Sequence, residues 1–248
     1  NSLLAIFSNW VDYKLKSLLP HLKSFVKDSA KIIKDLKTLS IPGEALLFSA
    51  DATSMYTNID TTLGVKSIQQ FLSDNSDKLP STFTTDLLLQ ILTIIMENNV
   101  FSFASTYWIQ LSGTAMGTPA ACTYAMLSFG QYEQSEILTE FKPNLFYYKR
   151  YIDDILGIWI PSHNEGEKTW EQFTQKLNNW GKLKWTTQYP STRVQFLDLD
   201  IKLDNGKISM ETYQKSKNLY LYIPPSLAHP PSCLKGLICG ELQRYWLQ

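Results

Sequence analysis

Cysteine, long apolar runs and net charge are all scarce in this chain of 248 residues. The three cysteines, Cys122, Cys233 and Cys239, are too few and too odd in number for a disulfide framework, so we expect a reducing compartment. No apolar run approaches the roughly 18 residues of a membrane-spanning helix. The amino terminus also lacks the basic-then-apolar pattern of a signal peptide. We therefore expect a soluble protein that is not exported.

The net charge is zero, because 23 Lys and Arg balance 23 Asp and Glu. A protein that binds nucleic acid usually has an excess of basic residues, so the balance by itself argues against such a partner. The charge is unevenly spread, however, with +3 over residues 1–46, −7 over 47–140, +1 over 141–200 and +3 over 201–248. Neutrality is an average over an acidic middle and basic ends, and a nucleic-acid partner stays open.

Composition and periodicity predict an α+β domain. Hydrophobic residues make up 44% and aromatic residues 13% of the chain, which is globular composition. Because the chain begins at Asn1 and ends without a tail, we expect a piece of a longer protein. Lys23, Lys27, Lys31 and Lys34 predict one basic helix face. Helices are predicted over residues 10–39 (broken at Pro20), 60–72, 84–99, 118–137 and 165–179. Strands are predicted over 45–50, 146–151, 155–160 and 183–189, with hairpins over 100–110 (turning at Ser105-Thr106) and 196–213 (turning at Asp204-Asn205-Gly206).

Three aspartates stand where carboxylates are costly. Asp153 and Asp154 separate two strands made of Phe, Tyr, Ile, Leu and Trp, and Asp51 follows the buried strand 45–50. Like charges this close repel one another, and each loses hydration among apolar neighbours. A divalent cation would offset both costs, and Mg²⁺ prefers such hard oxygen ligands. The alternative is that the pair is an acidic turn and Asp51 a loop residue, because acidic turns are common.

Motifs around these aspartates resemble those of reverse transcriptases, in the same order. Residues 151–154 have the tyrosine-x-Asp-Asp form, residues 48–59 resemble the first catalytic motif, and residues 110–121 resemble the glycine-containing motif. A closer resemblance, to the reverse transcriptases of Penelope-like retroelements, covers nearly the whole chain. It is carried by residues 27–29, 54–59, 196–199, 220–230 and 240–245.

The resemblance implies a fold and an activity. The fold is a right-hand polymerase palm with an antiparallel sheet backed by helices: residues 1–46 are partial fingers, 47–214 the palm and 215–248 the beginning of a thumb. Asp51 and Asp153 are implied to bind two Mg²⁺ ions directly (Mn²⁺ as a substitute), with Asp154 in support and the carbonyl of Ala52 as a further ligand. The reaction is attack of a primer 3′-hydroxyl on a deoxynucleoside triphosphate, which releases pyrophosphate.

Residues near the implied nucleotide site also receive roles from the resemblance. Tyr56 occupies the steric-gate position, where an aromatic ring excludes a 2′-hydroxyl; ordinary core packing is the alternative. Gly113 and Gly117 let the backbone approach the nucleotide or template closely. Met116 stands where the family commonly has glutamine, so van der Waals packing replaces a hydrogen bond to the nucleotide there.

Basic and aromatic residues are candidates for contact with phosphate. Lys182 and Lys184 follow the predicted helix 165–179, where the family often keeps a lysine that protonates pyrophosphate; a solvated strand end is the alternative. A second set is implied to contact primer and template, although an ordinary structural layer would use the same residue types. This set is Tyr151, Phe196, Lys215 and Lys217.

The implied partners are an RNA template, a DNA primer and deoxynucleoside triphosphates, without a membrane. A protein of a eukaryotic retroelement would carry out this reaction in the nucleus. Penelope-like proteins commonly have an endonuclease domain after the polymerase, and nothing in these 248 residues resembles one. Two other functions stay open: a decayed or domesticated relative that binds nucleic acid without catalysis, and a structural α+β protein with incidental acidic turns. His229, Cys233 and Cys239 lack the spacing and the fourth ligand of a zinc site.

Overall fold

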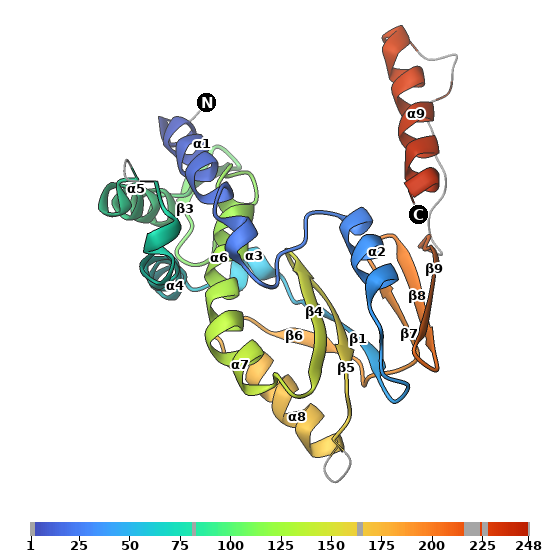
Figure 1. Cartoon of the computed structure of the whole chain (residues 1–248). Coiled ribbons are helices and arrows are strands. Elements are labelled where there is room, and N and C mark those ends of the chain that lie inside the picture. The colour runs from blue at the N-terminus through green and yellow to red at the C-terminus, as the bar shows by residue number, and fades with distance from the viewer. Residues whose placement is uncertain (1–2, 81–82, 163–165, 216–223, 225–227, 248) are drawn as a thin grey trace.

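The computed structural model describes residues 3–80, 83–162, 166–215, 224 and 228–247 (Figure 1). The α-helices in these ranges are α1 (Leu3–Lys16), α2 (Ser29–Thr38), α3 (Met55–Asn58), α4 (Thr61–Asp74), α5 (Thr85–Glu97), α6 (Ala121–Tyr132), α7 (Leu138–Glu140), α8 (Gly166–Leu177) and α9 (Pro231–Leu247). Two short 3-10 segments are η1 (Leu19–His21) and η2 (Ser76–Lys78), and η3 (Glu133–Ile137) is π-helical. The strands are β1 (Leu46–Ala52), β2 (Val100–Phe103), β3 (Thr106–Ile109), β4 (Leu145–Tyr151), β5 (Asp154–Trp159), β6 (Trp185–Thr187), β7 (Arg193–Phe196), β8 (Leu199–Asp204) and β9 (Lys207–Thr212). None of the described helices is long and apolar enough to cross a membrane.

A four-stranded antiparallel sheet forms the centre of the molecule, in the order β4-β5-β1-β6. β1 pairs with β5 from Leu46, opposite Trp159, to Asp51, opposite Asp154. β7, β8 and β9 form a separate three-stranded sheet, and β2 pairs with β3. The prediction of an α+β chain with an antiparallel sheet and helices is confirmed.

Alternate residues of the central strands face two different cores. Phe48 and Trp159 belong to the core that includes residues of α6 and α8, whereas Leu47 and Ile158 belong to the core that includes residues of α2 and β7–β9. Figure 1 shows the same division, with α2 and β7–β9 on one side of the sheet and α6–α8 on the other. This is the period-two alternation of strands that are buried on both faces.

Aromatic rings fill the first of these cores. The ring of Phe48 lies 5.1 Å from that of Trp170 and 5.3 Å from that of Phe173, measured between centroids. Gly157, on the neighbouring strand, leaves the space that Phe48 occupies, since a Cβ there would lie 2.1 Å from the Phe48 ring. The sheet is therefore held against α8 by close-packed rings in edge-to-face contact.

The amino-terminal segment differs from the predicted helix with one break at Pro20. Residues 17–28 separate α1 from α2, so Lys23 and Lys27 lie outside both helices and the prediction of a basic helix face is wrong. The physical reason is pairing with β4, because the Val26 N–H donates to the carbonyl of Arg150 at 3.3 Å. An extended stretch beside the sheet replaces the expected helical turn.

The turns between strands are partly as predicted. The turn at Asn205-Gly206 is confirmed, with φ of 46° and 78°. The turn between β2 and β3 lies at Ala104-Ser105, one residue before the predicted position. The strand predicted over 196–203 is interrupted, because Leu197 has a φ of 53° and turns the chain between β7 and β8. Helix α9 lies outside the helices predicted from the sequence.

Candidate active site

A tight turn between β4 and β5 carries Asp153. Tyr151 pairs with Asp154, so only Ile152 and Asp153 connect the two strands. Ile152 has a φ of 53°, in the left-handed region, where a β-branched side chain is a genuine outlier. Such a residue costs on the order of 1–3 kcal/mol and is found chiefly at functional sites. The turn is therefore a strained element, unlike an ordinary Asn-Gly hairpin.

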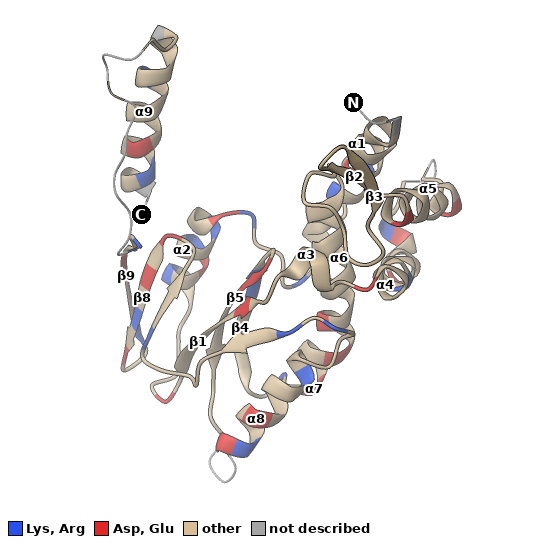
Figure 2. Cartoon of the chain, turned by 180° about the vertical axis from the view of Figure 1, so that it is seen from behind, with Lys and Arg blue, Asp and Glu red and all other residues tan. Residues whose placement is uncertain are grey.

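The pairing of β1 with β5 brings the distant aspartates together. Asp51 is directly opposite Asp154, and opposite residues of an antiparallel pair place their side chains on the same face. The Ala52 N–H donates to the carbonyl of Asp153 at 2.9 Å, which ties the turn to the end of β1. Figure 2 shows acidic residues at the end of β5 that lies towards α3. The three predicted catalytic residues thus share one end of the sheet, with Ala52 beside them.

The pKa values of Asp51 and Asp154 are both raised, in part by the charge of Asp153. Burial, together with the charges of Asp153 and Asp51, raises the pKa of Asp154 to about 6. Burial and Asp153 also raise the pKa of the more exposed Asp51. The ammonium group of Lys215 opposes the rise at both positions, so Lys215 lies near the cluster.

The donor set of this cluster suits a hard divalent cation, because it consists of carboxylate oxygens whose mutual repulsion a cation would relieve. Within the part of the chain that the structure describes, no three His, Cys, Asp or Glu side chains are already gathered around one metal position. The backbone therefore brings the predicted ligands to one end of the sheet.

Helix α3 and the glycine loop meet next to the aspartates. The carbonyl of Tyr56 accepts a hydrogen bond from the Thr114 N–H at 2.7 Å. A Cβ on Gly113, which has a φ of 76°, would lie 2.5 Å from that carbonyl oxygen. Burial, followed by the neighbouring Cys122 thiol and Asp153, raises the pKa of the half-buried Tyr56 to about 12. Gly113 is thus needed for close approach to α3, and Tyr56 lies within electrostatic reach of Asp153.

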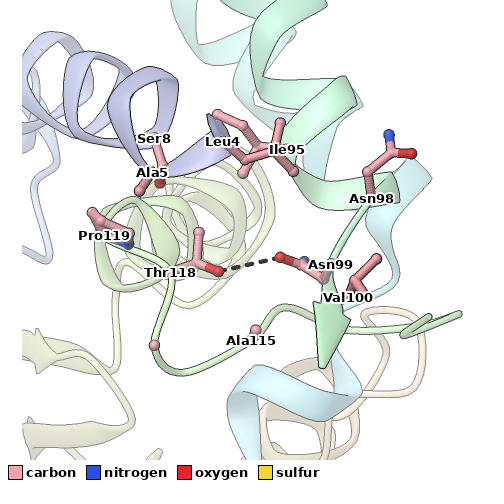
Figure 3. A pocket seen from close by; sticks show the side chains of 11 residues that line it. Leu4, Ala5, Ser8, Ile95, Asn98, Asn99, Val100, Ala115, Thr118 and Pro119 are labelled. Carbon is pink, nitrogen blue, oxygen red and sulfur yellow. Dashed lines mark hydrogen bonds between the residues drawn. The ribbon is translucent and has the colours of Figure 1, made fainter. Parts of the chain in front are cut away.

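The rest of the glycine loop runs towards a different part of the molecule. Met116 is 74% exposed. Gly117 lines a cavity of about 260 Å³ between α1, α5 and the segment before α6. In Figure 3, the Thr118 hydroxyl and Asn99 join across this cavity through a hydrogen bond of 3.2 Å. The cavity lining contains none of the three aspartates.

The residues predicted to contact phosphate or the primer–template duplex lie in different parts of the structure. Lys182 is exposed, and the ammonium group of Lys184 donates to the carbonyl of Asn178 at 2.8 Å, at the end of α8. Phe196 is only 2% exposed and packs in the second core, with the partly buried Tyr151 against the same core. Lys217 lies outside the described residues. Among the predicted contacts, Lys215 and Tyr151 are therefore the ones placed beside the aspartates.

One charged residue beside the site was not singled out from the sequence. Arg150 precedes the turn by two residues, and its side chain is 2% exposed. It contacts Glu133, whose side chain is fully buried. The available signal was a charged residue inside the apolar strand 146–151, since a buried charge requires a partner.

An antiparallel sheet of this order, with paired aspartates at its end and helices against it, is part of a polymerase-like fold. Solved structures that share the fold include telomerase of Candida tropicalis truncated from its C-terminal domain, with a TM-score of 0.59 and 14% identity over 84% of this chain and 45% of that chain. Telomerase of Candida albicans, in complex with a TWJ fragment of telomeric RNA, gives a TM-score of 0.61 and 12% identity over 84% of this chain and 38% of that one. The BmCPV RNA-dependent RNA polymerase at the elongation state gives a TM-score of 0.59 and 16% identity, over 84% of this chain and 20% of that chain. The chain thus spans less than half the length of these polymerases, and at such identities the likeness shows the fold alone.

No protein-family model and no curated protein sequence matches the chain.

Proposed function

We propose that this chain is the catalytic part of an RNA-directed DNA polymerase from a retroelement of the Penelope-like kind. The observation that carries the proposal is the register that places Asp51 opposite Asp154, with Asp153 in the strained turn between β4 and β5. Three carboxylates at one sheet end, held in place at a cost in strain and repulsion, are expected of a site that binds a divalent cation for catalysis.

Asp51 and Asp153 would hold the metal directly, with the Ala52 carbonyl as a further ligand and Asp154 in support. Mg²⁺ held there supplies charge neutralisation for the attacking and leaving oxygens of an in-line displacement at phosphorus. The chain itself supplies position: the bond from the Ala52 N–H to the Asp153 carbonyl fixes the spacing of the ligands. Tyr56, which lies within electrostatic reach of Asp153, would act as a steric gate that excludes a 2′-hydroxyl on the sugar of an incoming nucleotide.

The proposed substrates are an RNA template, a DNA primer and deoxynucleoside triphosphates. Lys215, whose charge acts on both Asp51 and Asp154, follows β9 and would meet the phosphate backbone of a duplex lying across the sheet end. In the proposed division of labour, residues 1–46 are partial fingers, 47–214 the palm and 215–248 the start of a thumb. The Penelope-like assignment is supported by the sequence motifs alone, and action in the nucleus follows from it.

The test is primer extension by the purified chain with Mg²⁺, in which RNA and DNA templates and deoxy- and ribonucleotides are compared. We expect extension of a DNA primer on RNA with deoxynucleotides, and loss of extension to background in Asp153→Asn. Asp204→Asn is the matched control, because Asp204 borders an exposed hairpin turn of the second sheet. Equal extension by the two variants would refute the assignment of the site.

The same assay separates the other two functions. A wild-type chain that binds primer–template but extends nothing in any combination would be a decayed, nucleic-acid-binding relative. A chain that neither binds primer–template nor is stabilised by Mg²⁺ would be a structural protein with an acidic turn.

A further inference from the structure

Arg150 lies on β4 and is buried together with its counter-ion. Its Nε donates to Oε1 of Glu133 at 2.8 Å, and the side chains are 2% and 0% exposed. Glu133 begins the π-helical segment that follows α6. The pair therefore joins the helix on one face of the sheet to the strand that leads into the turn.

The remaining donors of the guanidinium group reach two backbone carbonyls. Nη2 donates to the carbonyl of Met126 on α6 at 2.7 Å, and Nη1 donates to the carbonyl of Ile152 at 2.7 Å. The ring of Phe129 lies 5.3 Å from the guanidinium carbon. Arginine can make this set of contacts because its donors form a rigid planar fork, which a lysine ammonium cannot reproduce.

Glu133 is itself held by other elements. Its Oε2 accepts from the Ser24 hydroxyl at 2.7 Å, and its Oε1 accepts from the Tyr148 hydroxyl at 2.7 Å as well as from Arg150. The network is thus anchored in the amino-terminal segment, in β4 and in the end of α6. Such a fully bonded buried pair is rigid, and loss of one member leaves the other charge unpaired.

The carbonyl that Nη1 holds belongs to Ile152, the residue with the unfavourable φ. A β-branched residue does not stay in the left-handed region unless the surroundings fix it there. A charge-assisted hydrogen bond from a buried, immobile donor is a directional restraint of this kind. The next residue is Asp153, whose carbonyl in turn accepts from Ala52.

We propose that Arg150, braced by Glu133, is a positioning residue that holds the Ile152 turn in its left-handed conformation and thereby sets Asp153 beside Asp51. The inference rests on the proposed function for its consequence in catalysis, but the restraint itself can be measured without activity. The proposal predicts that replacing Arg150 has a smaller effect on the turn when residue 152 is a glycine, which adopts a positive φ without strain.

The test uses Arg150→Lys alone and combined with Ile152→Gly, since glycine adopts a positive φ freely. The activity-independent readout is amide hydrogen exchange at Ala52, whose bond to Asp153 opens when the turn relaxes. We expect exchange to accelerate about tenfold in Arg150→Lys and to return towards the wild-type rate in the double variant. The Leu47 amide lies in the same strand as Ala52 and donates to the carbonyl of Ser191. Its exchange rate reports opening of the whole strand and should not change.

Ala104→Gly in the Arg150→Lys background is the matched control, because Ala104 has a φ of 48° in the turn between β2 and β3. It removes a similar backbone strain far along the chain from Arg150 and should not restore protection at Ala52. Equal restoration by the two glycine substitutions, or unchanged exchange in Arg150→Lys, would overturn the inference. If Arg150→Lys does not fold, Glu133→Gln, which keeps the shape of the network, is compared in the same way.

Primer extension by the same variants links the restraint to the reaction. We expect a fall in the rate of nucleotide addition of at least about tenfold in Arg150→Lys, a higher Mg²⁺ requirement, an unchanged KM for primer–template, and rescue by Ile152→Gly. Inactive wild-type protein with the expected exchange pattern would refute the proposed function and leave the restraint established. If the wild-type protein is active but Ala52 exchange is unchanged in Arg150→Lys, the proposed function stands and the restraint is refuted.

Discussion

Asp154→Asn should make the metal-free protein more stable. The ionised Asp154 carboxylate is half-buried and lies close to Asp153 and Asp51, and these features raise its pKa from 3.8 to about 6. Such a difference corresponds to roughly 3 kcal/mol of unfavourable free energy when the group is charged. Solvent screening at a half-buried carboxylate reduces this to about 1 kcal/mol. Asparagine has nearly the same shape without the charge, so we expect a gain of about 1 kcal/mol in the free energy of unfolding near pH 7.

The pH dependence of this gain identifies its cause. Because the folded protein holds the Asp154 proton more tightly than the unfolded chain, ionisation destabilises the fold as the pH rises between 3.8 and about 6. The stability difference between Asp154→Asn and wild type should therefore be close to zero below about pH 4 and complete above about pH 6.5. Other titrating groups are shared by the two proteins and cancel in the difference.

The assay is urea unfolding followed by circular dichroism at several pH values, with EDTA present. Addition of Mg²⁺ should then reverse the order, since a ligand that binds only the folded state adds about 2.7 kcal/mol at a hundred times its Kd, and Asp154→Asn should gain less. A stability difference that is absent near pH 7, or that does not vary with pH, would show that the three carboxylates do not repel one another as the structure implies.

Three further substitutions, one of them with a matched control, test other parts of the structure. Tyr56→Ala should raise the incorporation of ribonucleotides relative to deoxynucleotides in primer extension; an unchanged ratio would remove the steric-gate role. Gly157→Ala should lower the free energy of unfolding by about 1–3 kcal/mol, because the new Cβ would lie 2.1 Å from the confined ring of Phe48. Gly43→Ala, with no atom within 4 Å of the new Cβ, should stay within about 0.5 kcal/mol of wild type in the same urea titration. Lys215→Ala should weaken primer–template binding and reduce its logarithmic salt dependence by about one, and an unchanged salt slope would exclude a phosphate contact.

The central sheet could be predicted from sequence because its strands are short, apolar and bounded by turn signals. The placement of the aspartates at strand ends could be predicted because carboxylates there are costly and their motifs are specific, while their catalytic role stays a prediction. The pairing of Asp51 with Asp154 required the structure, since register depends on which strands are neighbours. The interrupted strand at Leu197 also required it, because an aliphatic residue is not a turn signal.

The Arg150 network lay beyond sequence reasoning for a different reason. Its members come from three segments, and two of these segments have local structures that the sequence does not indicate. Ser24 lies in a turn where periodicity predicts helix, and Glu133 begins a π-helical segment where a regular helix is predicted. The spacing of apolar residues identifies regular helices and strands. The buried polar contacts of this network depend instead on irregular segments, which that spacing does not reveal.

Local costs converge on one place in this fold. Ile152 is held in a backbone conformation that its side chain disfavours, Asp154 carries a charge that its neighbours oppose, and Arg150 with Glu133 removes two charges from water. Each feature would be replaced at a gain in stability if folding were the only requirement. Ile152 lies in the turn between β4 and β5, Asp154 begins β5 directly after that turn, and Arg150 donates to the Ile152 carbonyl at 2.7 Å. A divalent cation held by Asp51, Asp153 and Asp154, as proposed above, would relieve the repulsion among the carboxylates, while the strained turn at Ile152 is held by the hydrogen bond from Arg150.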